Sequence, residues 1–262
     1  MSEMVTFTID GKTVHSTPDR TILEAAEEAG VYIPRLCHMK GLEPYGGCRV
    51  CTVRVNGRPA AACTQPVAEG IDVENDSDAM NAMRKTVVEM LFVEGNHFCM
   101  FCEKSGNCEL QGLAYRLGIA APRFPYLWPK RGVDASHPDI LIDHNRCIRC
   151  ARCVRASRDL DGKSVFGFVG RGPATPLAVN ARARLVDTDI DITDKVVDVC
   201  PVGAILRKRG AYSTPIDSAP VDHDPIGTEI GCPVELTVKG ADEQPRVATR
   251  SLAGCFGVTC RS

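Results

Sequence analysis

The chain opens with an alternating pattern of apolar and polar residues. Residues 5–14 alternate around an Asp-Gly pair, which predicts a β-hairpin with a two-residue turn. Residues 21–30 are rich in helix formers, with acidic residues early and Gly30 at the end, so we expect a helix there. A further strand is expected over residues 49–56. Together these elements predict a small α+β domain over residues 1–78.

Helical periodicity follows from about residue 78. Apolar residues recur at near-helical spacing, at Met80, Met83, Val87, Val88, Met90 and Leu91. A loop that contains cysteines interrupts this pattern, and a second short helix is expected over residues 109–117, just before Gly118. We therefore predict a short helical segment over residues 79–136.

The third part of the chain mixes strand and helix patterns. The expected elements are strands at 140–142 and 165–168 and helices at 154–160 and 193–199. They predict a second α+β domain over residues 137–212. Prolines then recur at 215, 220, 225, 233 and 245, so we expect residues 213–262 to form an extended tail that depends on a partner surface.

Composition limits the environment of the protein. The 262 residues include 14 cysteines, which is above ordinary usage. The chain start lacks the basic stretch, apolar stretch and cleavage site of a signal peptide. We therefore expect a soluble, cytoplasmic protein whose clustered thiols bind metal. The apolar run over residues 87–93 is too short to span a bilayer, and the net charge of -2 gives no reason to expect nucleic acid as a partner.

Four cysteines form the first candidate metal site. Cys37, Cys48, Cys51 and Cys63 are separated by ten, two and eleven residues. Four thiolates suit zinc and iron-sulfur clusters equally, so spacing alone leaves both open. Glycines in the loop over residues 44–51 let backbone N–H groups turn toward bridging sulfides. This composition favours a cluster over structural zinc or reduced core thiols.

A second candidate set contains three cysteines and a histidine. Cys99, Cys102 and Cys108 cannot complete a four-coordinate site, and His97 is a nearby fourth donor. The alternative, that His97 is a surface or supporting residue, stays open on the sequence alone. If His97 is a ligand, a neutral imidazole in place of a thiolate removes one negative charge and raises the reduction potential of the centre.

The third set is the most specific pattern in the chain. Cys147, Cys150 and Cys153 have the spacing that binds three irons of a 4Fe-4S cubane, and Cys200, which precedes Pro201, is the expected fourth ligand. No second run of this kind occurs in the sequence. We therefore expect Cys200 to ligate the same cluster.

Arginines recur every three residues near the third set. Arg146, Arg149, Arg152 and Arg155 have two interpretations: a solvated helix face, or positive charge that offsets a cluster or binds an acidic partner. Three further cysteines, Cys232, Cys255 and Cys260, are most simply free thiols. The stretch 246–257 also weakly resembles the opening strand and cluster loop of a nickel-iron hydrogenase small subunit, which leaves ligation by Cys255 and Cys260 as an alternative.

The sequence contains no motif for binding a substrate. No Gly-x-Gly-x-x-Gly follows a strand, no Walker loop occurs, and no serine-hydrolase, zinc-protease or kinase signature is present. We expect no catalytic residues in this chain. Electron transfer through three centres is the function that this pattern favours.

Several stretches resemble a known family. TILEAAEEAGVYIPRLC, residues 21–37, is similar to plant-type 2Fe-2S ferredoxins and to the N-terminal domain of the large iron-sulfur subunit of respiratory complex I. The resemblance implies a β-grasp fold in which the first set holds a 2Fe-2S cluster. EGNHFC followed by CEKSGNC is similar to the hydrogenase-linked form of a 4Fe-4S site with one His and three Cys, although complex I typically has three residues between His and Cys where this chain has one.

Over residues 5–230 the chain resembles the iron-sulfur subunit of the diaphorase module of NAD-reducing nickel-iron hydrogenases. The matching stretches are FGFVGRGP at 166–173, AVNA at 178–181, TDKVVDVCPVGA at 193–204 and DPIG at 224–227. The resemblance implies a flavoprotein partner that binds FMN and NAD, and nickel-iron hydrogenase small and large subunits as further partners.

Other functions remain open at this point. The equivalent subunit of a NAD-linked formate dehydrogenase, or of complex I, is an alternative of the same class. An iron-only hydrogenase shares this N-terminal architecture, but its catalytic half is missing. A zinc-stapled interaction module without a redox role is an alternative of another class.

Overall fold

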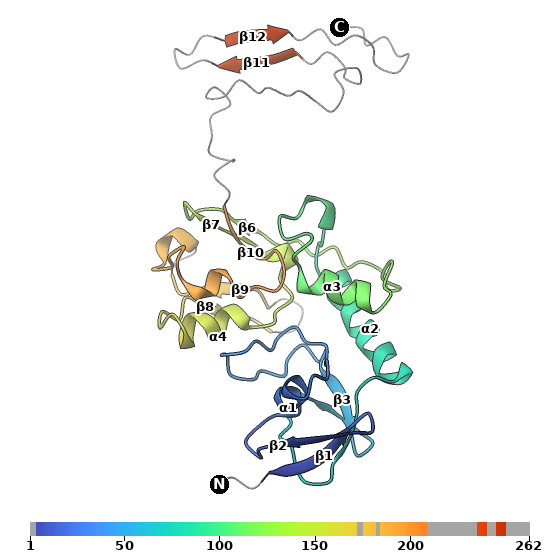
Figure 1. Ribbon diagram of the computed structural model, residues 1–262. Coiled ribbons are helices and arrows are strands. Elements are labelled where there is room, and N and C mark those ends of the chain that lie inside the picture. The colour runs from blue at the N-terminus through green and yellow to red at the C-terminus, as the bar shows by residue number, and fades with distance from the viewer. Residues whose placement is uncertain (1–3, 172–174, 182–183, 209–234, 240–244, 250–262) are drawn as a thin grey trace, which may run out of the picture. The chain divides into compact units, whose positions relative to one another are not determined.

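Two compact units make up the chain, residues 1–208 and residues 209–262. The computed structural model (Figure 1) describes residues 4–171, 175–181, 184–208, 235–239 and 245–249. In the described part of the chain, all cysteines belong to the first unit. No helix among these residues has the length and hydrophobicity to cross a membrane.

A five-stranded mixed sheet forms the N-terminal part of the first unit (Figure 1). Its strands are β1 (Val5–Ile9), β2 (Lys12–Ser16), β3 (Thr52–Val55), β4 (Arg58–Ala61) and β5 (Asp72–Glu74). They lie in the order β2-β1-β5-β3-β4, with β1 antiparallel to β2 and parallel to β5. The predicted hairpin is confirmed: Asp10 and Gly11 have φ angles of 50° and 77°, as a tight two-residue turn requires.

Helix α1 (Ile22–Glu28) packs against this sheet. Thr21 begins the helix with a capping box, in which the Thr21 side chain accepts the Glu24 N–H and the Glu24 carboxylate accepts the Thr21 N–H. The buried face of the helix consists of Ile22, Leu23, Ala25 and Ala26. Gly30, with φ of 70°, follows the helix end, so the predicted helix and its stop signal are confirmed.

Two helices connect the sheet to the rest of the unit, α2 (Asp78–Glu94) and α3 (Glu109–Arg116). A short 3-10 turn, η1 (Cys99–Phe101), lies between them. Arg84 of α2 is buried and donates hydrogen bonds to the Thr52 and Asn75 backbone carbonyls and to the Asn75 side chain, at 2.8 to 2.9 Å. These bonds fix α2 to the N-terminal sheet.

The last part of the first unit consists of short strands around one helix. A three-stranded sheet has the order β10-β7-β6, and β8 pairs with β9. Helix α4 (Arg152–Asp159) contains Cys153, the last cysteine of the run, and its sequence prediction is confirmed. The strands are β6 (Val133–Asp134), β7 (Ile140–Asp143), β8 (Phe166–Phe168), β9 (Leu177–Val179) and β10 (Ile205–Arg207).

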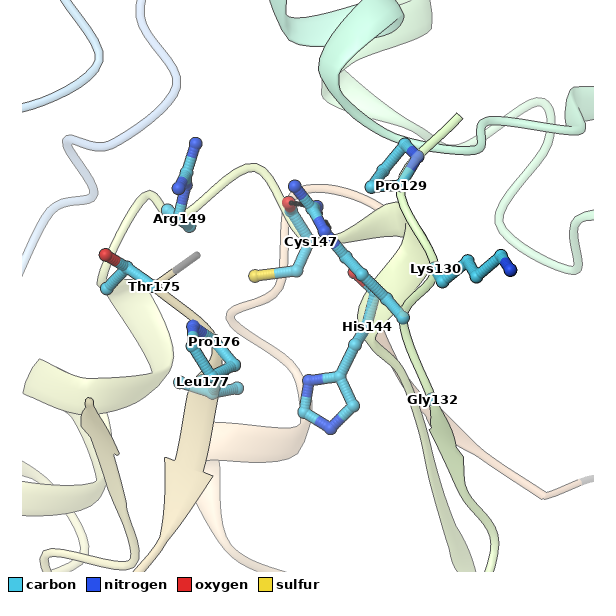
Figure 2. A pocket seen from close by; sticks show the side chains of 10 residues that line it. Pro129, Lys130, Gly132, His144, Cys147, Arg149, Thr175, Pro176 and Leu177 are labelled. Carbon is cyan, nitrogen blue, oxygen red and sulfur yellow. Dashed lines mark hydrogen bonds between the residues drawn. The ribbon is translucent and has the colours of Figure 1, made fainter. Parts of the chain in front are cut away.

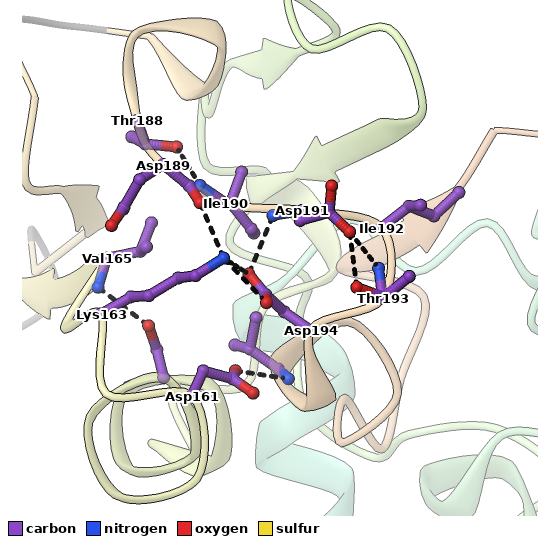
Figure 3. Close-up of polar contacts among 12 residues, drawn as sticks. Asp161, Lys163, Val165, Thr188, Asp189, Ile190, Asp191, Ile192, Thr193 and Asp194 are labelled. Atoms are coloured by element: carbon purple, nitrogen blue, oxygen red, sulfur yellow. Dashed lines mark hydrogen bonds and ion pairs between the residues drawn. The ribbon is translucent and has the colours of Figure 1, made fainter.

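The prediction of a helix over residues 193–199 is wrong. The structure has only a 3-10 turn there, η5 (Lys195–Val197). The Asp161 carboxylate accepts the Lys195 and Val196 N–H groups at 2.8 and 3.0 Å, and the Asp194 carboxylate binds Lys163 (Figure 3). The Asp161 oxygens cap the first N–H groups as at a helix N-terminus, but Pro201 follows so soon that only a short turn fits before it. These contacts position the chain that leads to Cys200.

The core of the first unit contains two hydrophobic clusters. One fills the space between α1 and the N-terminal sheet. The other is built mainly from the α4 region, but it also includes Leu36, Leu42 and Val50 from the cysteine loops of the N-terminal part. The loops of the first cysteine set therefore pack into the same core as the third set.

The second unit is described only as a two-stranded hairpin. Strand β11 (Glu235–Lys239) pairs in antiparallel register with β12 (Pro245–Thr249). The rest of the predicted tail lies outside the described residues. So do Cys232, Cys255 and Cys260.

Candidate metal centres

The structure brings together all four thiols of the first set. Cys37 follows α1, Cys48 and Cys51 precede β3, and Cys63 follows β4. The Cys37 side chain forms hydrogen bonds with those of Cys48 and Cys63, and Cys51 does so with Cys63. Cys37, Cys51 and Cys63 are at most 1% exposed. Four soft donors converge here, three of them buried and Cys48 partly exposed.

Backbone N–H groups also point at this site. The pKa of the Cys37 thiol is lowered, chiefly by the hydrogen bonds from Cys48 and Cys63 and further by the N–H groups of Cys48 and Gly47. A Cβ at Gly47 would lie 2.2 Å from the Tyr45 ring, so a side chain here would displace that ring. Such N–H donors stabilise thiolates, the form of cysteine that binds metal.

The four donors of the second set line one small cavity: His97, Cys99, Cys102 and Cys108. The buried Nε2 atom of His97 has no hydrogen-bond partner. Burial lowers the pKa of His97 to about 4, so the imidazole is neutral at pH 7. The ring also has a hydrogen bond with the Leu91 backbone, the kind of contact by which proteins orient ligating histidines.

Two glycines make room for the donors of the second set. A Cβ at Gly95 would lie 2.6 Å from His97 Nε2, and a Cβ at Gly203 would lie 2.5 Å from Cys102 Sγ. The edge of the Phe92 ring packs against His97, with ring centroids 5.5 Å apart at 69°. Neither glycine can be identified from the sequence, because each contact depends on the folded chain.

All four cysteines of the third set line another small cavity. Burial, together with the nearby Cys200, raises the pKa of Cys147 to about 11 and that of Cys150 to about 12. The N–H groups of Arg149 and Arg152 oppose this by hydrogen-bonding to Cys147 and Cys150. Buried thiols need positive charge to ionise, and bound metal supplies it.

The backbone of the third loop has a special conformation. Arg149 and Ala151 have φ angles of 53° and 58°, a region that residues other than glycine seldom adopt. Arg49, in the first cysteine loop, has φ of 60°. These residues with left-handed φ angles turn the backbone around the donors of the first and third sets.

The four arginines do not form a solvated face. Arg152 and Arg155 are 4% and 5% exposed. Arg146 forms ion pairs with Glu103 and Asp143 at 3.1 and 3.0 Å, and Arg149 pairs with Glu94. Of the two interpretations of this pattern, the solvated helix face is wrong.

A larger cavity of about 540 Å³ lies beside Cys147 (Figure 2). Its charged wall residues Lys130, Arg131 and Arg149 are all basic. Arg131 donates to the Cys147 carbonyl at 3.3 Å and to the Glu94 carbonyl at 3.2 Å. The third set therefore lies next to a basic depression.

The donor atoms of the described sets are those that ligate iron-sulfur clusters. Across the described residues, no group of three or more His, Cys, Asp or Glu side chains has the arrangement that a single metal ion needs. The same residues do form three convergent sets with buried sulfur and, in the second set, an unpartnered imidazole nitrogen. Iron-sulfur clusters are bound by donors of this kind.

Three family descriptions match successive parts of the chain. Residues 2–78 match a 2Fe-2S iron-sulfur cluster binding domain. Residues 84–123 match the NADH-ubiquinone oxidoreductase-G iron-sulfur binding region. Residues 137–206 match the NADH-quinone oxidoreductase subunit 3 ferredoxin-like domain.

Known relatives cover most of the chain. The NAD-reducing hydrogenase HoxS subunit gamma of Cupriavidus necator is 44% identical over 213 residues, which are 81% of this chain and 91% of the relative. The NADH-ubiquinone oxidoreductase 78 kDa subunit of Neurospora crassa is 36% identical over 79% of this chain but only 28% of its own length. A crystal structure of NAD+-reducing NiFe-hydrogenase in the H2-reduced state matches 84% of this chain and 94% of its own, with a TM-score of 0.77 and 45% identity.

Fold and donor sets together define an iron-sulfur electron-transfer protein of mixed α and β structure. The chain belongs to the family of the iron-sulfur subunit of NAD-reducing hydrogenase, HoxS gamma. The predicted resemblance is thereby confirmed, as is the role of an electron-transfer subunit of a NAD-dependent oxidoreductase. Complex I subunits are more distant relatives with the same domains.

Proposed function

We propose that this chain relays electrons between a flavoprotein subunit that binds FMN and NAD and a pair of nickel-iron hydrogenase subunits, one small and one large. The overall reaction would be reduction of NAD+ by H2. The observation that carries the proposal is the convergence of three donor sets within one compact unit of a chain 44% identical to a NAD-reducing hydrogenase subunit. That relative and this chain match over nearly all of the relative's length.

We propose one 2Fe-2S cluster and two 4Fe-4S clusters. Contact among the thiols supports the first set as the 2Fe-2S ligands. The unpartnered Nε2 atom supports His97 as a ligand, and the shared cavity supports Cys200 as the fourth ligand of the third set. The proposed ligands are Cys37, Cys48, Cys51 and Cys63; His97, Cys99, Cys102 and Cys108; and Cys147, Cys150, Cys153 and Cys200.

Each proposed centre has its own segment. The segments are 1–78, 79–136 and 137–212, followed by a tail over 213–262 that we propose binds a partner. One family match lies within each of the first three segments, at residues 2–78, 84–123 and 137–206, which supports this division.

Bound clusters supply one-electron oxidation and reduction. The residues of this chain do the rest. Buried cysteines keep water from the centres, backbone N–H groups stabilise thiolates, and arginines offset negative charge. No residue of the chain has to move a proton or contact a substrate.

The test is anaerobic purification of the chain with its native partners. We expect roughly ten iron and ten acid-labile sulfide per chain, together with H2-dependent reduction of NAD+. A colourless protein that contains zinc and no sulfide would overturn the proposal in favour of an interaction module.

A formate dehydrogenase or complex I subunit is the second candidate. The 36% identity to the Neurospora crassa 78 kDa subunit favours it, although the chain corresponds to only 28% of that protein. The same purified complex decides between them. Reduction of NAD+ by formate and not by H2 would favour the second candidate.

A further inference from the structure

A single nitrogen of Arg155 links the first and third cysteine sets. Its Nη2 atom donates to the Cys37 carbonyl at 2.6 Å and to the Cys150 carbonyl at 3.4 Å. Cys37 belongs to the first set and Cys150 to the third. The remaining nitrogens donate to the carbonyls of Ala151 and Glu43. Two loops far apart in the sequence are thus held by one guanidinium group.

Among the residues that the structure describes, no carboxylate forms an ion pair with Arg155. The residue is 5% exposed, and in the described part of the chain its hydrogen bonds all go to backbone carbonyls. Asp159, whose pKa Arg155 helps to lower, is itself bound to Arg158. A buried charge without a counter-charge is strongly unfavourable. A thiolate-bound cluster on either side is an anion that fits this position.

Arg152 supports the same junction from one turn earlier on α4. Its Nη2 atom donates to the His38 carbonyl at 2.9 Å, and its guanidinium pairs with Glu109. The two arginines therefore bind consecutive carbonyls of the first cysteine loop. Glu109 neutralises the charge of Arg152. Arg155 is therefore the arginine whose positive charge can act on the two centres.

We propose that Arg155 is a positioning residue that fixes the Cys37 loop against the Cys150 loop and supplies positive charge to the two iron-sulfur centres that these loops hold. This inference rests on the proposed function. A fixed positive charge near a centre favours its reduced form and raises its potential. The shared hydrogen bonds also keep the spacing between the two centres constant.

The charge is tested with Arg155→Gln in the complete complex, by redox titration followed with electron paramagnetic resonance. We expect both potentials to fall, with the one-electron reduction equilibrium of the 2Fe-2S centre changing roughly tenfold, or about 59 mV. Arg158→Gln is the matched control, because it removes a charge from the exposed side of the same helix. We expect its potentials to equal those of the wild type.

The bridge is tested with Arg155→Lys, which keeps the charge but not the planar fork that reaches several carbonyls. We expect potentials near those of the wild type and a weaker spin-spin interaction between the two reduced centres. If Arg155→Gln does not fold, Arg155→Lys still tests the bridge. Unchanged potentials in Arg155→Gln, or an unchanged spin-spin interaction in Arg155→Lys, with full iron and sulfide content, would overturn the inference.

Iron and sulfide analysis of the wild type separates the two possible failures. A wild-type complex without sulfide would refute the proposed function itself. A fully loaded wild type with an Arg155→Gln variant of identical potentials would refute only the role of Arg155.

Discussion

Gly203 lies so close to Cys102 that a Cβ at the glycine would be 2.5 Å from the Cys102 sulfur. Gly203 follows Cys200 of the third set by three residues, whereas Cys102 belongs to the second set. The Glu109 N–H also donates to the Pro201 carbonyl at 2.9 Å. The second and third sets therefore share a wall of closely packed backbone.

Gly203→Ala should disturb the second centre. The added methyl group must displace the Cys102 sulfur, because real Cβ contacts are never this short. We expect loss or a clear change of one 4Fe-4S signal in electron paramagnetic resonance, with the 2Fe-2S signal unchanged. Gly112→Ala is the control, because a Cβ there meets no atom within 4 Å. Identical spectra for both variants would contradict the proposed ligation by Cys102.

His97→Cys should lower the potential of the same centre. A thiolate in place of a neutral imidazole adds a negative charge, which opposes the addition of an electron. Redox titration of the variant measures the shift. His15→Cys, at an exposed histidine of β2, should leave all potentials unchanged. A potential that does not move in His97→Cys argues that His97 is not a ligand.

His97 should also make stability depend on pH. Burial lowers its pKa from 6.5 to about 4. Below pH 6.5 the unfolded chain binds a proton at His97 that the folded chain does not, so the free energy of unfolding falls as the pH drops toward 4, by about 3 kcal/mol at most. Denaturant unfolding of wild type and His97→Gln at several pH values measures the difference. Parallel pH profiles for the two proteins would show that His97 is not buried in its neutral form.

Arg84→Ala should destabilise the junction of α2 with the N-terminal sheet. The substitution leaves the Thr52 and Asn75 carbonyls without their buried donor, and we expect a loss of about 3 kcal/mol in the free energy of unfolding. Arg20→Ala, which removes an ion pair between exposed side chains, should cost less than about 1 kcal/mol. Equal losses in the two variants would contradict this account.

Local signals explain which elements the sequence predicts. The Asp10-Gly11 turn and the Gly30 stop signal act through neighbouring residues, and both are confirmed. The expected helix at 193–199 is reduced to a 3-10 turn between Asp194 and Pro201, and the Asp161 carboxylate that accepts its first N–H groups comes from more than thirty residues away. Periodicity contains no information about such distant partners.

The same contrast between local and distant contacts applies to the candidate sites. The sets that spacing predicts have members that lie together in the structure, and those of the second and third sets each line one cavity. The arginine pattern could not be resolved, because the partners of Arg155 in the Cys37 loop lie 118 residues away in sequence. Gly95 and Gly203 gave no signal, because the side chains that require them come together only on folding.

The inclusion of Leu36, Leu42 and Val50 in the core around α4 limits how freely the N-terminal ferredoxin segment can be exchanged between proteins. A fragment that ends at residue 78 would keep its sheet and α1 but would leave these three side chains uncovered. The N-terminal segment therefore depends on the rest of the first unit to cover its apolar side chains. Any chimera that carries it must also carry a matching surface from the 4Fe-4S part, with arginines at the positions of Arg152 and Arg155.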